Sequence, residues 1–381
     1  MLKKLFILLF FVLCEFCLAL DVKIKSNQHL GKNIIYSIYS ASEFPMIAHV
    51  LKLSLDNIDI KLIPALGQRE EVSSIAKRSN AFIAINGSNY RRGGKYNGNR
   101  LNLLYLKESI YSDFQFIRGS FGWCSRIKRA IIDNTFLKIN FLINKQAFPV
   151  DQINQPRDLG QSVLYTDKAD KFLLLHIPGK NIIIDEKGIV QDITSEIPRE
   201  ILPGYLIYQI DRDSSFTIKK GMNTEFNYEI KSVENNLIYN DYDFVIGGAG
   251  LLLRNGEIMT SQLYNEFSQG TAIVHCHDEV AADFYTKKQQ QWLIEQRHPR
   301  TAIGITDKDE ICIVVVDGRQ NNSEGLTLHE LASFMKMLCC TNALNIGGGG
   351  CTTLCINKEV VNNPSANEER PVSEALCFYL R

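Results

Sequence analysis

The sequence predicts an α+β protein that is β-rich, a single large domain of mixed sheet with a few helices. Most patterned segments are short, rich in Ile, Leu, Val and Tyr, and separated by Gly, Asn, Asp and Pro, as β-strands are. Helical patterns are few and do not alternate regularly with the strands, which argues against a doubly wound sheet. The chain has 381 residues, 45% of them hydrophobic and 22% charged, so it can bury a large core, and wholesale disorder is excluded.

The expected strands are runs of apolar and β-branched residues bounded by turn-forming residues. The run at 310–316 is almost continuously apolar, which is typical of a strand buried on both faces. In chain order the expected strands are Asn33–Tyr39, Met46–Leu55, Ile58–Pro64, Ala81–Ile85, Lys171–Ile177, Asn181–Asp185, Tyr205–Ile210, Phe226–Val233, Glu310–Val316 and Ala343–Ile346.

Three segments carry helical signals: Glu70–Arg78, the polar Ala281–Gln296, and Leu328–Cys340. The third is the clearest, because Thr327 as N-cap and Glu330 three residues later form a capping box. Its apolar residues also recur at spacings of three and four, which places them on one helix face. They are Leu328, Leu331, Met335 and Leu338.

Residues 1–20 have the layout of a secretory signal peptide. Lys3 and Lys4 precede an apolar run, and Ala19 offers a small residue for cleavage. Glu15 within the run argues against a membrane anchor, because a carboxylate in hydrocarbon is costly. We therefore expect an exported protein, secreted or periplasmic, with no stable membrane span. Removal of the signal leaves eight of the ten cysteines, and the sequence leaves their pairing open.

The charge balance excludes two classes of partner. Lys and Arg number 42, and so do Asp and Glu. A net charge of zero provides no field that would attract nucleic acid or an anionic membrane. We expect neither as a partner, and the oligomeric state stays open.

Polar residues or glycines follow three apolar strands at their carboxyl ends. Asn86-Gly87 follows the strand at 81–85, Asp317-Gly318-Arg319 follows the strand at 310–316, and four glycines, 347–350, follow the strand at 343–346. Taken singly, Asn-Gly and Asp-Gly are common turn dipeptides, and a structural role is the simpler interpretation. Rigid strands that carry polar residues at their ends are nonetheless the usual way to hold a site.

The glycine run suggests that a ligand or another backbone segment approaches closely there. Its amides could form an anion-binding concavity, and Arg319 and Arg300 could bind a phosphate with their planar guanidinium groups. An isolated arginine is more often a solvated surface residue. The nucleotide-binding spacings GxGxxG and GxxxxGK[ST] do not occur at the run.

Two other constellations give weaker signals. His275-Cys276-His277-Asp278 resembles a metal cluster, yet no second Cys/His pair at a zinc spacing accompanies it, so we expect no metal site. Cys351 as a nucleophile with His329 as its base lacks any feature that would bring the two together.

Six C-terminal blocks, in register, resemble the phosphodiester glycosidase family. They are HPRTAIGIT (298–306), VVVDGR (314–319), GLTLHELASFM (325–335), ALNIGGGGCTTL (343–354), VVNNPS (360–365) and RPVSEAL (370–376), with AFIAINGSNY (81–90) and DFVIGGAGLLLRNGEI (243–258) upstream. The resemblance covers about 70–381, so 21–69 are expected to be N-terminal strands that pack on this domain. It implies a β-rich α+β domain that hydrolyses a sugar-1-phosphodiester without a cofactor, and for some bacterial members an association with exopolysaccharide.

The resemblance also implies roles for individual residues. It carries catalytic roles to Asp317, Asn86 and Asn345, and substrate or phosphate binding to Arg319, Arg300, Gly348, Gly349, Gly350, Thr352 and Thr353. Two positions depart from the family pattern: its aspartate is Gly347 here, and its serine is Cys351.

The loss of that aspartate leaves two hypotheses. In the first, the protein is an active hydrolase in which Asp317 is the base or the nucleophile, because a phosphomonoester is a good leaving group and needs little protonation. In the second, it is a glycan-phosphate binding protein on the same fold, with catalysis impaired at Gly347.

Overall fold

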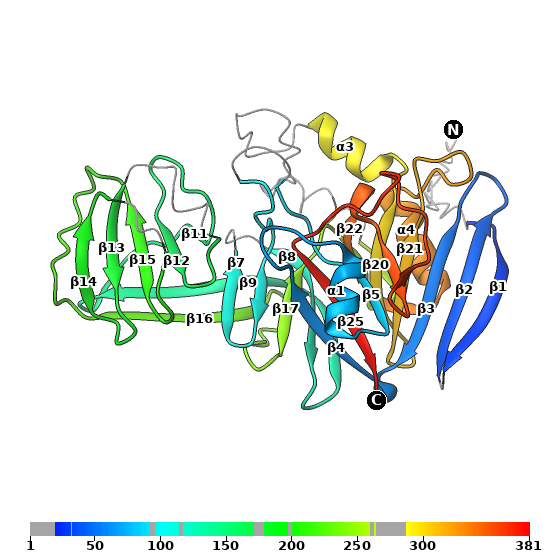
Figure 1. Ribbon diagram of the computed structural model, residues 1–381, viewed down its shortest axis with the longest axis horizontal. Helices are drawn as coiled ribbons and strands as arrows, with labels where there is room; N and C mark the ends of the chain where they lie inside the picture. The colour runs from blue at the N-terminus through cyan, green and yellow to red at the C-terminus, as the bar shows by residue number, and fades with distance from the viewer. Residues whose placement is uncertain are drawn as a thin grey trace, which may run out of the picture.

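The computed structural model describes residues 20–31, 33–91, 96–113, 117–170, 179–196, 200–259, 263 and 287–381. Residues 1–19 of the expected signal peptide, the expected strand Lys171–Ile177, and residues 275–278 lie outside the described residues. Within the described part, strands predominate and form four sheets (Figure 1). No helix in that part is long and apolar enough to cross a membrane.

The largest sheet has eight strands, and every neighbouring pair in it is antiparallel. Its centre is hydrophobic because β21, β20 and β22 alternate between two apolar faces, each covered by another layer. In spatial order its strands are β1 (Val22–Gly31), β2 (Ile34–Ala41), β3 (Ala48–Ser54), β21 (Glu310–Val316), β20 (Arg300–Thr306), β22 (Cys340–Gly348), β18 (Leu251–Arg254) and β19 (Glu257–Ile258).

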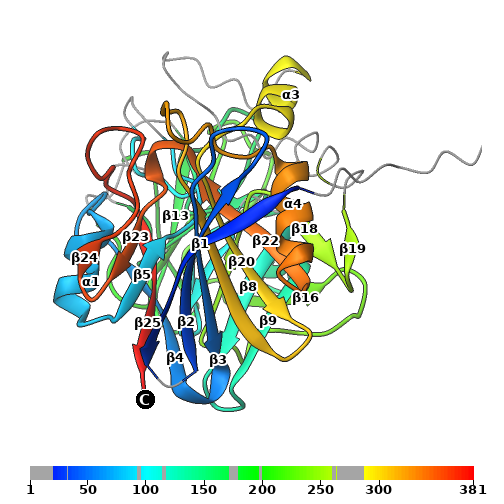
Figure 2. The same ribbon diagram turned by 90° about the vertical axis from the view of Figure 1, so that its right-hand side faces the viewer.

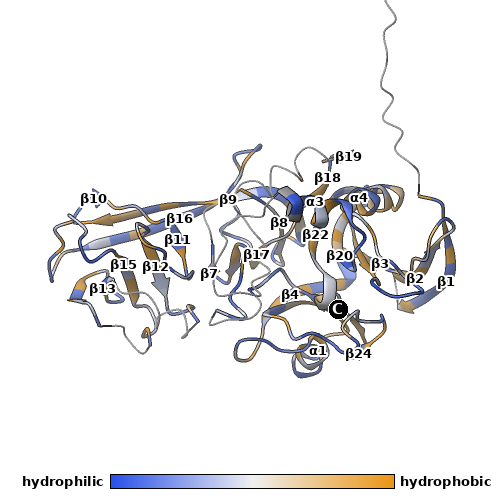
Figure 3. Ribbon diagram, turned by 90° about the horizontal axis from the view of Figure 1, so that it is seen from above, coloured by the Kyte–Doolittle hydropathy of each residue, from blue (hydrophilic) through white to orange (hydrophobic). Residues whose placement is uncertain are grey.

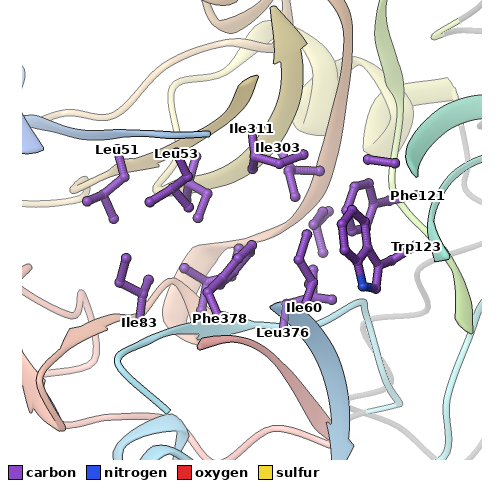
Figure 4. Close-up of a cluster of buried hydrophobic side chains, with 14 of the residues drawn as sticks. Leu51, Leu53, Ile60, Ile83, Phe121, Trp123, Ile303, Ile311, Leu376 and Phe378 are labelled. Carbon is purple, nitrogen blue, oxygen red and sulfur yellow. The ribbon is translucent and has the colours of Figure 1, made fainter. Parts of the chain in front are cut away.

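A five-stranded antiparallel sheet covers one face of the large sheet. The two sheets bury the main core between them, where Leu51 and Ile311 face Ile83 and Phe378 (Figure 4). The strands of the smaller sheet, in spatial order, are β24 (Glu359–Val360), β23 (Leu354–Ile356), β5 (Ile83–Asn86), β25 (Glu374–Leu380) and β4 (Ile58–Pro64), and the 3-10 turn η1 (Leu55–Asn57) joins β3 to β4.

Helices complete the two outer layers. Helix α1 (Val72–Ser79) packs on the five-stranded sheet, and α4 (Leu328–Met337) packs on the opposite face of the large sheet, so the two lie on opposite sides in Figure 2. Helix α3 (Lys287–Glu295) packs against α4. The part of the molecule that contains these two sheets therefore has four layers, in the order helix, five-stranded sheet, eight-stranded sheet and helix.

A seven-stranded sheet closes the main core at one side with Phe121 and Trp123 (Figure 4). Its longest strand, β9 (Arg129–Ile143), pairs with β16 (Thr224–Ser232) over nine residues and extends away from the core (Figure 3). The strands are β10 (Gln146–Ala147), β9 (Arg129–Ile143), β8 (Arg118–Cys124), β17 (Phe244–Gly247), β6 (Leu104–Leu106) and β7 (Ser109–Ser112), with β16 (Thr224–Ser232) paired to β9.

The far end of β9 and β16 supports a lobe with its own five-stranded sheet, at the left of Figure 1. Its core is continuous with that of the seven-stranded sheet, because Tyr208 and Ile182 belong to the same buried cluster as Phe141 and Val245. The lobe consists of β11 (Gln152–Ile153), β12 (Val163–Thr166), β15 (Leu206–Ile210), β13 (Lys180–Ile184) and β14 (Val190–Thr194).

The fold confirms the β-rich prediction and refines the rest. The expected mixed sheet is four sheets, and of the described pairings only β11 with β12 is parallel. The capping box is present: Glu330 N donates to Thr327 Oγ1 over 3.0 Å, and Thr327 N donates to the Glu330 carboxylate over 2.8 Å. The helix expected to reach Cys340 ends at Met337, because Cys339 has φ +68° and the chain then enters β22.

Candidate active site

A glycine turn lies at the end of β22 and continues into the 3-10 turn η3 (Gly349–Cys351). Gly349 N donates to Pro299 O over 2.8 Å, and an ideal Cβ on Gly348 would lie only 2.7 Å from the same oxygen. Gly349 itself has φ +66°. The close approach expected of the glycine run is thus an approach to the backbone just before β20, which residues with a Cβ could not follow.

Two guanidinium groups lie against this turn. An ideal Cβ on Gly349 would stand 3.3 Å from Arg319 Nη2, and one on Gly350 would stand 2.2 Å from Arg370 Cζ. Arg319 is exposed, whereas Arg370 is half-buried. Within the described part of the chain Arg370 forms no hydrogen bond or ion pair with another residue. Two planar donors on one glycine backbone can bind an anion that has several oxygens.

Arg300, the other arginine expected to bind phosphate, lies beneath this surface. Its Nε donates to Leu326 O over 2.8 Å, and its Nη2 donates to Leu293 O over 2.7 Å and to Gln296 O over 3.1 Å. The two Nη2 bonds satisfy carbonyls at the C-terminal end of α3, and the Nε bond reaches the segment just before α4. Burial first, and Arg319 second, lower the pKa of Arg300 to about 9, so it is still a cation at neutral pH.

Arg300 and its neighbours position Arg319 through α3. His298 Nε2 contacts Trp292 O over 3.1 Å, and the two rings lie in contact, tilted by 56°, with centroids 4.2 Å apart. Arg319 Nη2 contacts His298 Nδ1 over 3.3 Å, and its guanidinium lies 5.9 Å from the Trp292 ring centroid. Trp292 is 40% exposed, so an aromatic face borders the site beside the arginine.

Asp317 is buried directly after β21, and its two oxygens have different neighbours. Oδ1 accepts hydrogen bonds from Asn362 Nδ2 and from Asn363 N, both over 3.0 Å. Oδ2 lies 3.5 Å from Nε2 of His49 on β3. The carboxylate is therefore anchored through one oxygen, and the other faces a ring nitrogen that makes no hydrogen bond among the described residues.

Asn86 joins β5 to the other two strand ends. Its Oδ1 accepts from Thr301 Oγ1 over 2.7 Å and from Thr353 N over 3.2 Å. Asn345 lies on β22, where its Nδ2 donates to Ala249 O over 2.8 Å. Asn86 thus connects the end of β5 with β20 and with the segment after the glycine turn, and Asn362 connects that segment to Asp317, because its Nδ2 donates to Asp317 Oδ1 and to Thr352 O.

Three buried side-chain oxygens among the expected site residues have no hydrogen-bond partner in the described part of the chain. They are Asn345 Oδ1, Thr352 Oγ1 and Thr353 Oγ1. Each residue is at most 3% exposed. A buried oxygen without a partner costs about 1–3 kcal/mol, so several of them near one glycine turn point to a ligand or water there.

Gly347 occupies a confined position. An ideal Cβ on it would lie 3.0 Å from Asn86 Nδ2, 3.1 Å from Gly87 O and 3.7 Å from Asn89 Oδ1. A side chain here would fit only if these groups moved by a few tenths of an ångström. No carboxylate stands at this point in the present chain.

Cys351, the second departure, contacts a tyrosine. Its Sγ donates to the Tyr90 hydroxyl over 3.6 Å, and that hydroxyl donates to Pro371 O over 2.7 Å. Burial first, and Cys351 second, raise the pKa of Tyr90, so the phenol keeps its proton. Each cysteine within the described ranges is free of disulfide bonds.

The sequence did not single out four residues that the structure places at the site. Arg370 and Asn362 lie in C-terminal blocks with no local chemical pattern, and only their positions after strands could have indicated them. His49 and Tyr36 lie in apolar strands near the N-terminus. A lone histidine in such a strand is the one signal that could have identified His49.

Comparisons with known proteins indicate the family of this chain and proteins that share its fold. A family model for phosphodiester glycosidases matches residues 179–379. Human N-acetylglucosamine-1-phosphodiester alpha-N-acetylglucosaminidase is 27% identical over 147 residues, which is 37% of this chain and 26% of that protein. An uncharacterised SPbeta prophage-derived protein of Bacillus subtilis is 29% identical over 135 residues, 29% of this chain and 21% of that protein. The matched region thus spans about a quarter of these relatives.

A solved structure of a candidate exported protein from Burkholderia pseudomallei has the same fold. It superposes with a TM-score of 0.71 at 17% identity and covers 90% of this chain and 76% of that one. At this identity the likeness concerns the fold alone. The family model begins at residue 179, so it leaves the N-terminal strands unmatched.

Proposed function

The chain belongs to the phosphodiester glycosidase family, and on this premise we propose that it hydrolyses a sugar-1-phosphodiester. Water would supply the hydroxyl at sugar carbon C1 as the bond from C1 to the phosphate oxygen breaks. The phosphate would leave as a phosphomonoester, which retains the bridging oxygen. Neither step needs a cofactor.

The observation that carries this proposal is the pair of guanidinium groups on the glycine turn. A phosphodiester has one negative charge, and the departing phosphomonoester gains a second. Arg319 and Arg370 would therefore bind the leaving group more tightly as the bond breaks than before it breaks. Such differential binding lowers the barrier to the chemical step.

Asp317 is the proposed base or nucleophile. Asn362 and Asn363 hold its Oδ1, so Oδ2 is the oxygen that would take a proton from water or attack C1. Four further residues are proposed to bind the substrate: Asn86, Asn345, Thr352 and Thr353. The last three each have a buried side-chain oxygen that has no hydrogen-bond partner in the described part of the chain. Arg300 would contribute positive charge from beneath.

A second candidate function is binding of a glycan phosphate without hydrolysis. It is favoured by Gly347, where the position next to Asn86 and Asn89 carries no carboxylate. In this case the arginines and the unsatisfied oxygens would hold the ligand, and no group would activate water.

One experiment separates the two functions. The purified protein is assayed on a panel of aryl sugar-1-phosphodiesters, together with the variant Gly347→Asp. Turnover by the unmodified protein supports hydrolysis. Binding without turnover, with activity gained in Gly347→Asp, supports the binding protein and contradicts the hydrolase.

We also propose that the protein is exported and acts in glycan processing, with exopolysaccharide as one candidate substrate. The expected signal peptide at 1–20 supports export. In this proposal residues 21–69 pack on a main domain formed by 70–381. Mass spectrometry of the mature N-terminus tests it, and a protein that keeps residue 1 and is recovered only from the cytoplasmic fraction would contradict it.

A further inference from the structure

A buried polar chain runs from the N-terminal strands to Asp317. The Tyr36 hydroxyl lies 2.7 Å from His49 Nδ1, and the two rings are stacked with an interplanar angle of 10°. His49 Nε2 in turn lies 3.5 Å from Asp317 Oδ2. All three residues are at most 7% exposed.

The strand register produces this arrangement. His49 pairs with Val315 on β21, so His49 and Asp317 are diagonal neighbours on the same face of the sheet. Ile38 pairs with His49 on the other side, which makes Tyr36 the corresponding diagonal neighbour on β2. Strands β2 and β3 and the position that directly follows β21 therefore contribute one residue each to this polar series.

The neighbours of the ring determine which nitrogen carries hydrogen. Burial first, and Asp317 second, raise the pKa of Tyr36 to about 12, so its hydroxyl keeps its proton and can donate to Nδ1. The hydrogen of a neutral ring is then on Nε2, which faces the carboxylate. In the opposite tautomer, a nitrogen lone pair would face the negative oxygen.

We propose that His49 is a positioning residue that orients the Asp317 carboxylate through its Nε2 hydrogen, and that Tyr36 fixes the required tautomer. The proposal rests on the proposed function, because it concerns how Asp317 is held for turnover. The 3.5 Å separation is longer than a hydrogen bond, and catalytic hydrogen bonds often shorten only when substrate is bound.

This polar series of Tyr36, His49 and Asp317 lies partly outside the region that the family model matches. Residues 36 and 49 precede that region, which begins at residue 179. The N-terminal strands would thus do more than extend the sheet, since they would supply the second support of the carboxylate. The first support is the pair of N–H donors from Asn362 and Asn363.

Two substitutions at the same position test the role. In His49→Gln the side-chain amide can still donate to Asp317 Oδ2, whereas His49→Leu has no donor. We expect His49→Leu to lose about 100-fold in kcat and His49→Gln to stay within about tenfold of the unmodified protein. The affinity of both for inorganic phosphate should be unchanged, which also shows that they fold. Equal losses in the two variants, or no loss, would overturn the proposal.

A measurement that needs no turnover separates this inference from the proposed function. With 15N-labelled histidine, the ring nitrogens of His49 are assigned by their absence in His49→Gln. We expect the hydrogen on Nε2, and a change of tautomer in Tyr36→Phe. A hydrogen on Nδ1 alone overturns the positioning role even in an active enzyme. If the aryl sugar-1-phosphodiester panel shows no turnover while Nε2 carries the hydrogen, the proposed hydrolysis is contradicted. The inferred orientation of the Asp317 carboxylate by His49 is then retained.

Discussion

The guanidinium of Arg370 lies so close to Gly350 that an ideal Cβ on the glycine would stand 2.2 Å from Arg370 Cζ. Arg370 comes from the segment just before β25, and Gly350 comes from the turn after β22. The contact therefore depends on the packing of two sheets. It places a second cation on a turn that already carries Arg319.

Replacing Arg370 by methionine should weaken phosphate binding. A hydrogen bond to a charged group is worth about 1.5–3 kcal/mol, so we expect the Kd for inorganic phosphate to rise about tenfold or more. Isothermal titration calorimetry measures this. Arg126→Met is the matched control, because Arg126 is 72% exposed on the turn between β8 and β9. An unchanged Kd in Arg370→Met would argue against the two-arginine site.

Asp317→Asn should abolish most turnover while the ligand still binds. The variant keeps an acceptor for Asn362 and Asn363 but loses the charge, so we expect kcat to fall about 10²- to 10⁴-fold. Asp56→Asn, at a residue whose side chain is 84% exposed, is the control and should have unchanged kcat. Normal turnover by Asp317→Asn would assign the base or nucleophile to another residue.

Gly348→Ala should damage both stability and phosphate binding. The new methyl group would meet Pro299 O at 2.7 Å, and since that atom belongs to the backbone the turn itself must shift. Overpacking of this kind costs about 1–3 kcal/mol. Urea denaturation measures the loss, with Gly31→Ala as the control, because its Cβ would have only an ordinary contact at 3.9 Å. Equal unfolding free energies for Gly348→Ala and the unmodified protein would contradict the close approach.

The buried Glu374 should give the protein a specific pH dependence. Its carboxylate accepts from Arg100 Nε over 3.0 Å and from Ser88 N over 3.0 Å. Burial raises the pKa of Glu374 above 4.5, although Arg100 opposes the change. The folded state therefore binds this proton more tightly than the unfolded state does. The stability that it contributes is complete below pH 4.5 and is lost as the pH rises through the raised pKa.

Urea denaturation across this pH range, on the unmodified protein and on Glu374→Gln, measures the effect. We expect the unfolding free energy of the unmodified protein, relative to the variant, to decrease as the pH rises. Glu225→Gln, at an exposed position on β16, is the control and should leave the pH dependence unchanged. A difference that stays constant with pH would contradict the assignment.

Local patterns in the sequence were sufficient where the interactions are local. The Thr327–Glu330 capping box lies within four residues. β21 and β4 have the expected bounds because β21 is an almost continuous apolar run and β4 alternates apolar with charged residues before Pro64. By contrast, β9 was not anticipated. Its residues 133–135 are Asp, Asn and Thr, and it forms a fifteen-residue strand because β8 and β16 pair with it along its length. Such pairing is tertiary, and the polar residues at 133–135 interrupt the apolar pattern that would have indicated one long strand.

By itself, the sequence determined that the chain is β-rich, that polar residues and glycines follow three apolar strands, and that a glycine turn lies after the third. Backbone propensity and hydrophobic pattern encode these features locally. Only the tertiary structure decided which side chains meet at that turn. Arg370, 20 residues after Gly350, reaches it because two sheets pack together, and His49 reaches Asp317 through strand register across 268 residues of chain. Contacts at such separations depend on the whole fold.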